Sequence, residues 1–232
     1  MFKRHKIFSA VVFMVIILSV SSLTGYADAP YQGTERLAVN LWWELEPMVS
    51  LGAEYPIPRD KAVKNLLEEA RKVFSAMIYG YSFVYTPSDK LRKVSEVFKL
   101  VPVAELKWGD RQMEVVSTEV KDKKLYAKIV YHLLEYQFLN RSAWSSSALA
   151  SVSGRGEGNI FKGSGQRDVS FNNAVKNAVR NYLRARVFNK PREIRGEVIL
   201  WDQPELTVGN GMYITAVRIK LKINKIEAYR IF

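Results

Sequence analysis

The sequence predicts an α+β protein made of two closely packed halves, and three observations lead to that class. Apolar residues at helical intervals predict long helices over residues 59–80 and 168–188. Short β-rich runs separated by Pro, Gly or polar turns predict antiparallel strands between and after these helices. The 232 residues contain no cysteine, so burial of apolar side chains, rather than disulfide bonds, must stabilise the fold.

Residues 1–27 are predicted to be a secretory signal peptide. Three basic residues near the start are followed by an apolar run over 7–20 and then by small and polar residues. The run is shorter than the roughly 18 to 20 residues that span a bilayer, which favours cleavage over retention as an anchor. We expect cleavage after Ala27 and export to the periplasm or cell envelope. No cysteine is present at that point to carry a lipid.

The first half, residues 28–147, is predicted to mix helices with strands. Its elements are a short amphipathic helix over 34–47, the helix over 59–80, a strand over 81–87, a short helix from Ser88, and a hairpin of 112–120 with 125–139. Leu37, Leu41 and Leu45 give the first helix its spacing, and the polar "KDKK" gives the hairpin its turn. The serine-rich "NRSAWSSSA" marks the boundary between the halves.

The second half, residues 148–232, is predicted to be a β-α-β-β domain with one helix on a small antiparallel sheet. A glycine-rich strand precedes the helix, "EVILW" forms the next strand, "DQPELTVGNG" is a loop, and 212–229 is a long strand. The apolar stripe of the helix consists of Phe171, Ala174, Val175, Ala178, Val179, Tyr182 and Leu183.

The stretch "SVSGRGEGNIFKGSGQRD" does not fit a phosphate-binding loop. Gly158 and Gly163 have the spacing of such a loop, but Ser164 stands where a lysine is needed. The glycines also fail the GxGxxG pattern of dinucleotide-binding folds. We therefore expect them to let an edge strand bulge and leave its sheet, since glycine tolerates positive φ and close backbone approach.

The quoted strand, followed by "AVKNAVRNYLRAR" and a returning pair of strands, resembles a known small domain. That domain occurs in periplasmic flagellar-assembly protein T and in related secreted envelope lipoproteins. The resemblance covers residues 148–228 and implies a non-enzymatic part of an envelope assembly. It supplies no catalytic residues, and the chain lacks the acylated cysteine of the lipoproteins.

The charge of the chain is strongly basic, with 35 Lys and Arg against 23 Asp and Glu and a formal net charge of +12. Such an excess favours an acidic envelope component or protein assembly as partner, and peripheral contact with an anionic membrane. A solvated basic surface without a partner is the alternative. Nucleic acid is not expected as a partner of an exported protein.

Two rows of basic residues are the candidate binding residues. In the last strand they alternate with apolar residues and share one face of the sheet, and in the helix they recur at every fourth position. They are Arg218, Lys220 and Lys222 in the strand, and Lys176, Arg180 and Arg184 in the helix.

The sequence offers little catalytic chemistry. After signal removal only His132 remains among histidines, and it lies in an apolar run that suits a strand better than a catalytic base. We expect no catalytic residues, metal site or cofactor. The function favoured is a non-catalytic binding or scaffolding component of the bacterial cell envelope that engages an acidic partner through the basic sheet face. The alternative is a hydrolase of cell-wall glycan or lipid that uses Glu44 and Glu46 beside two tryptophans.

Overall fold

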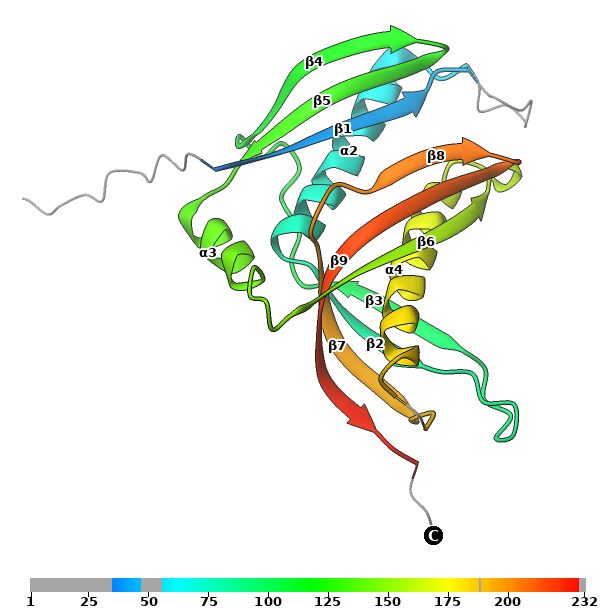
Figure 1. Ribbon diagram of the computed structural model, residues 1–232. Coiled ribbons are helices and arrows are strands. Elements are labelled where there is room, and N and C mark those ends of the chain that lie inside the picture. Colours follow the sequence, from blue (N-terminus) through cyan, green and yellow to red (C-terminus); the bar gives the residue numbers. More distant parts are fainter. Residues whose placement is uncertain (1–34, 47–55, 188, 230–232) are drawn as a thin grey trace, which may run out of the picture. The chain divides into compact units, whose positions relative to one another are not determined.

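The computed structural model describes residues 35–46, 56–187 and 189–229 (Figure 1). All of these residues lie in one compact unit, residues 33–232, and the predicted signal peptide lies outside them. Within the described ranges the chain forms three α-helices and nine strands in antiparallel sheets, which confirms the α+β class. No helix in these ranges is long and apolar enough to cross a membrane.

A three-stranded antiparallel sheet comes entirely from the first half of the chain. Its strands, in spatial order, are β1 (Arg36–Glu44), β5 (Lys124–His132) and β4 (Met113–Lys121). The predicted β4–β5 hairpin is confirmed, and Asp122 and Lys123 have positive φ, as its tight turn requires. Helix α2 (Arg59–Ile78), also predicted, packs against β1 and β5.

Strand β1 corrects the helix expected over residues 34–47. It pairs with β5 along its whole length, from Arg36 opposite His132 to Glu44 opposite Lys124. Leucines four positions apart fit both periods, because four residues are about one helical turn and also two full repeats of a strand. The intervening Val39 is fully buried on the same face as its neighbouring leucines, which is the strand pattern.

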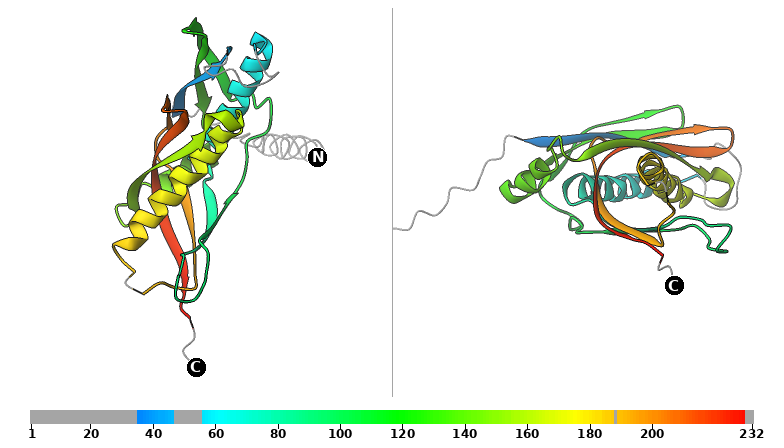
Figure 2. Two further views of the ribbon diagram at one scale, coloured as in Figure 1. Left: turned by 90° about the vertical axis from the view of Figure 1, so that its right-hand side faces the viewer. Right: turned by 60° about the horizontal axis from the view of Figure 1, so that its bottom comes forward.

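A six-stranded antiparallel sheet combines strands from both halves (Figure 2). In spatial order it contains β3 (Val97–Pro102), β2 (Tyr81–Thr86), β7 (Glu193–Leu200), β9 (Met212–Glu227) and β6 (Ala150–Asn159), with β8 (Glu205–Gly209) paired to β9. Because β2 pairs with β7, this sheet runs across the boundary expected at residue 148. Helix α2 also contacts β7 and so joins the two sheets.

Strand β3 replaces the helix expected from Ser88. Asp89 and Val94 exchange two backbone hydrogen bonds of 2.9 Å, which closes a tight turn directly after β2. The Asp89 carboxylate accepts hydrogen bonds from the backbone N–H groups of Leu91 and Arg92. Aspartate stabilises turns in this way, so the segment reverses direction before it can complete a helix.

Two further segments depart from the prediction. The second arm of the hairpin ends at His132, and residues beyond it form α3 (Glu135–Ala143). The Gln137 side chain accepts a hydrogen bond from the N–H of Leu134, which starts that helix. The loop expected over 202–211 contains β8, which turns into β9 at Asn210 and Gly211, both with positive φ.

The glycine-rich strand β6 does not bulge as expected. Its register with β9 is continuous from Ala150 opposite Leu221 to Asn159 opposite Met212. Helix α4 (Gln166–Arg184), predicted from its apolar stripe, lies directly on this strand. A Cβ atom on Gly156 would lie 2.2 Å from the backbone nitrogen of Ala174. The glycines therefore allow close packing of a helix on a regular strand.

Candidate functional site

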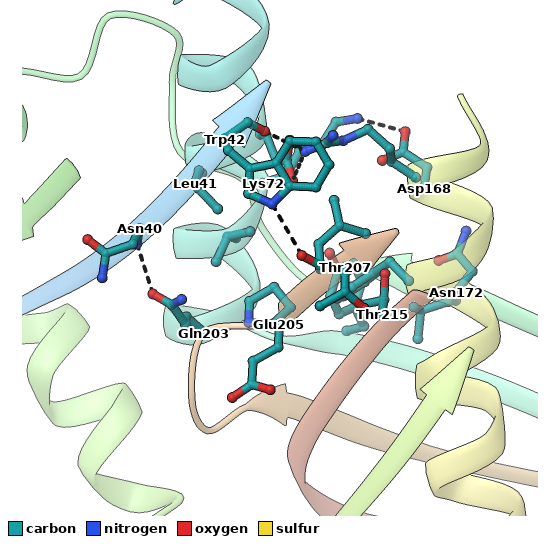
Figure 3. Close-up of a pocket in the computed structure, with 18 of the residues that line it drawn as sticks. Asn40, Leu41, Trp42, Lys72, Asp168, Asn172, Gln203, Glu205, Thr207 and Thr215 are labelled. Atoms are coloured by element: carbon teal, nitrogen blue, oxygen red, sulfur yellow. Dashed lines mark hydrogen bonds and ion pairs between the residues drawn. The ribbon is translucent and has the colours of Figure 1, made fainter. Parts of the chain in front are cut away.

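A cleft of about 510 Å³ lies where an edge of one sheet faces an edge of the other (Figure 3). Strand β1 supplies Asn40 and Trp42 to one wall, and the segment entering β8 supplies Gln203 and Leu206 to the opposite wall. Helices α2 and α4 and strands β2, β3 and β9 supply most of the rest of the lining, with Phe171 of α4 among the apolar residues. Elements from the whole chain thus form this one site.

The two facing edges are connected by side chains, and in the described ranges β1 and β8 belong to different sheets and form no backbone ladder with each other. The Asn40 N–H donates a hydrogen bond of 2.9 Å to the side-chain oxygen of Gln203. The Trp42 indole N–H donates one of 3.2 Å to the Leu206 carbonyl (Figure 3). Side chains therefore satisfy edge groups that a neighbouring strand would otherwise pair, and leave space between the edges.

Arg167, in the first turn of α4, is the most buried charge in the lining, with only 7% of its side chain exposed. Its Nη2 donates hydrogen bonds to the Trp42 carbonyl at 2.8 Å and to both carboxylate oxygens of Glu69, at 2.9 and 3.2 Å. The guanidinium lies 4.6 Å from the ring centre of Trp42 and 4.5 Å from that of Trp43. Among the described residues, its buried Nε has no hydrogen-bond partner.

Both cations of the lining, Arg167 and Lys72, are paired with carboxylates. Burial raises the pKa of Glu69, while the neighbouring Arg167 guanidinium acts in the opposite direction. Lys72 and Asp168 form an ion pair of 3.0 Å. Burial also raises the pKa of the Tyr81 phenol above its ordinary value. The cations of the cleft thus already have anionic partners, and the cleft does not favour an anionic ligand.

The sequence did not single out Arg167 or Glu69 as site residues. The sequence does contain a weak signal of burial. Arg167 lies four residues before Phe171, so this charged residue falls on the apolar face of α4. Glu69 similarly lies three residues after the buried Leu66 of α2. A charge in an apolar stripe must find a partner, but that partner lies 98 positions away in the chain.

The three basic residues of β9 lie on the face opposite α4, yet their surroundings differ. Arg218 forms an ion pair with Asp202. Lys220 is 9% exposed, and its ammonium donates hydrogen bonds to the carbonyls of Ser146 and Leu149 at 3.3 and 3.5 Å. Lys222 is exposed and stands opposite an acidic residue of β7 in the sheet register. They do not form one continuous exposed row.

The basic row of α4 is divided as well. Lys176 and Arg180 lie 3.7 and 3.9 Å from the Glu96 carboxylate, which also accepts a hydrogen bond from Tyr85. Arg184 is exposed and lines a hollow of about 320 Å³ near the end of the helix. Only the last residue of this row therefore faces solvent without an ion pair among the described residues.

The two carboxylates of the hydrolase hypothesis lie in unlike environments. Glu44 is 3% exposed and accepts a hydrogen bond of 2.9 Å from the Tyr213 hydroxyl. Glu46 pairs with Lys123 at 2.5 Å at the end of the β4–β5 turn. In the described ranges, no group of three or more His, Cys, Asp or Glu side chains is placed to hold a metal ion.

Comparison with known proteins gives a family but no activity. A protein of Treponema pallidum (strain Nichols), itself described only as uncharacterized, is 24% identical over 208 residues, which are 89% of this chain and 87% of that protein. The search of solved structures finds no match. A family model without a functional description matches residues 25–229. The chain therefore belongs to this family of uncharacterised proteins.

Proposed function

We propose that the chain is a non-catalytic, exported binding protein of the bacterial cell envelope, and that its ligand lies in the cleft between β1 and β8. The observation that carries the proposal is the buried Arg167 guanidinium, held by Glu69 and flanked by tryptophan rings at the wall of an open cleft. Rigid aromatic and hydrogen-bonding groups at a concave surface are typical of small-molecule sites.

The lining indicates the chemistry of the ligand. Apolar contacts are available from Trp42, Phe171 and Leu206, while Thr207 and Asn172 offer hydrogen bonds nearby. Because the lining cations are already paired, a polyanion gains little by entering. The ligand we propose is an amphipathic, largely uncharged molecule whose apolar part packs on the tryptophan side of the cleft.

The remaining parts of the proposal rest on the sequence. The predicted signal peptide supports export, and the resemblance of residues 148–228 to the flagellar-assembly domain, which stays a prediction, supports a non-enzymatic role. The pairing of Arg218 and the burial of Lys220 make the β9 face a poorer candidate for an acidic partner than the sequence indicated. The separate environments of Glu44 and Glu46 lend the hydrolase alternative no support.

A neutral dye tests the cleft. N-phenyl-1-naphthylamine fluoresces in apolar surroundings, and we expect it to bind the secreted chain saturably with one site per molecule. Asn172→Trp, at an exposed lining position of α4, should fill the cleft and abolish this binding. Asn181→Trp is the matched control, since it places the same side chain on an exposed position of the same helix outside the cleft. Equal binding by both variants would contradict the proposal.

A further inference from the structure

The turn between β2 and β3 exposes four residues whose backbone is held firmly. Its base is closed by the two hydrogen bonds between Asp89 and Val94, and two N–H groups of the turn donate to the Asp89 carboxylate. That carboxylate also pairs with Arg92 at 2.5 Å. The four residues of the turn, Lys90 to Lys93, therefore have a defined backbone conformation.

An apolar side chain occupies the tip of this turn. Leu91 is 95% exposed, more than any other large hydrophobic residue in the described ranges. Lys90, Arg92 and Lys93 surround it in sequence, and all three are exposed. The turn thus exposes one apolar side chain that is flanked in sequence by three cationic side chains.

Further cations lie at the same end of the six-stranded sheet. The Lys190 ammonium donates a hydrogen bond of 2.7 Å to the Ser88 carbonyl, which joins the segment after α4 to the start of the turn. Arg184, the last residue of α4, and Arg186, two residues beyond it, are exposed close by in sequence. Figure 2 shows the end of α4 and the β2–β3 turn near the end of β9.

The acidic residues at this end already have cationic partners. Asp89 pairs with Arg92, Glu193 with Arg195, and Glu227 with Lys225; Glu96 faces Lys176 and Arg180. Five other cations at this end form no ion pair among the described residues. These are Lys90, Lys93, Arg184, Arg186 and Lys190. Together with Leu91 we call them the basic tip.

We propose that the basic tip docks onto an anionic phospholipid bilayer, with Leu91 entering the boundary between headgroups and acyl chains. Lysine and arginine near an anionic surface each add to the attraction, and a buried apolar side chain adds a contribution that does not depend on salt. A soluble acidic polymer would use the cations but gains nothing from an exposed leucine. The leucine is thus the observation that favours a membrane. The proposal is independent of the cleft, because the two sites share no residue.

Co-sedimentation with vesicles tests the docking. The secreted form, residues 28–232, contains the whole described unit and lacks the apolar run that would insert by itself. We expect it to bind vesicles of equal parts phosphatidylglycerol and phosphatidylcholine, and to bind pure phosphatidylcholine far more weakly. Lys90→Ser with Lys93→Ser should weaken binding about twenty-five-fold, since each surface cation contributes a factor of about five. Leu91→Ser should weaken it about tenfold.

Matched variants separate these effects from general ones. Leu139→Ser removes a leucine that is 57% exposed on α3, and Lys121→Ser with Lys128→Ser removes two exposed lysines from the three-stranded sheet. Both controls should bind as the unchanged chain does. Failure to bind phosphatidylglycerol vesicles would overturn the proposal. Vesicle binding that is insensitive to Leu91→Ser but lost with the lysines would also overturn it, because the contact would then be electrostatic alone, without entry of the leucine.

Discussion

Gly156→Ala tests whether the glycines of β6 serve close packing of α4. A methyl group at this position would lie 2.2 Å from the backbone nitrogen of Ala174 and 2.3 Å from the carbonyl oxygen of Ser170. Both atoms belong to the helix backbone, so no side-chain rotation can relieve the contact. Strand and helix must therefore separate.

The structure sets the size of the effect. Real Cβ atoms essentially never approach other atoms more closely than 3.0 Å, so the helix must retreat by roughly 1 Å along a tightly packed interface. Overpacking of this kind costs about 3 kcal/mol of unfolding free energy. For a chain of this length that corresponds to a fall in Tm of about 9 °C.

Urea unfolding followed by far-ultraviolet circular dichroism measures the loss of unfolding free energy in Gly156→Ala. Gly209→Ala is the matched control, since it adds the same methyl group to a strand glycine whose new Cβ would meet only the Ile214 side chain at 3.6 Å. We expect the control to remain within about 0.5 kcal/mol of the unchanged protein. A Gly156→Ala protein as stable as the control would refute the close-packing account of the glycines.

Three further predictions concern the cleft and the turn. Arg167→Met leaves the Glu69 carboxylate without its cationic partner and should lower the free energy of unfolding by about 3 kcal/mol. Adding Glu69→Gln in a double-mutant cycle should restore part of this loss. Trp42→Phe should cost about 1 kcal/mol in urea unfolding, because the indole hydrogen bond to β8 is lost. The Arg92 hydrogen bond holds the pKa of Asp89 below its ordinary 3.8, so the stabilisation from this carboxylate is complete above pH 3.8 and is lost as pH falls through the lowered pKa. In nuclear magnetic resonance spectra the Leu91 amide should titrate with a midpoint below 3.8, and a midpoint at or above 3.8 would contradict the turn geometry.

The long helices could be predicted from the sequence because their apolar stripes extend over several turns. The stripe from Phe171 to Leu183 has no equally good interpretation as a strand, and α4 buries most of it. The leucines of β1 fitted two periods, and only the pairing with β5 selects the strand. After Ser88, hydrogen bonds to the Asp89 carboxylate form a turn within about five residues. A segment this short contains too few residues to show a helical or a strand period.

The cleft could not be predicted because its parts are distant in sequence. The hydrogen bonds that define its edges join residues 163 and 164 positions apart, and Arg167 reaches Glu69 across 98. Strand alternation correctly indicated a common face for the basic residues of β9. It could not indicate that Asp202 would pair with one of them or that Lys220 would be covered.

The central claim is that the cleft holds a ligand in the cell. Native mass spectrometry of the protein isolated without denaturant from the envelope of the cells that produce it tests this most directly. We predict an added mass at one molecule per chain in the unchanged protein and in Asn181→Trp, and its loss in Asn172→Trp. The bare mass of the chain in all three proteins, or an adduct that persists in Asn172→Trp, would contradict the account.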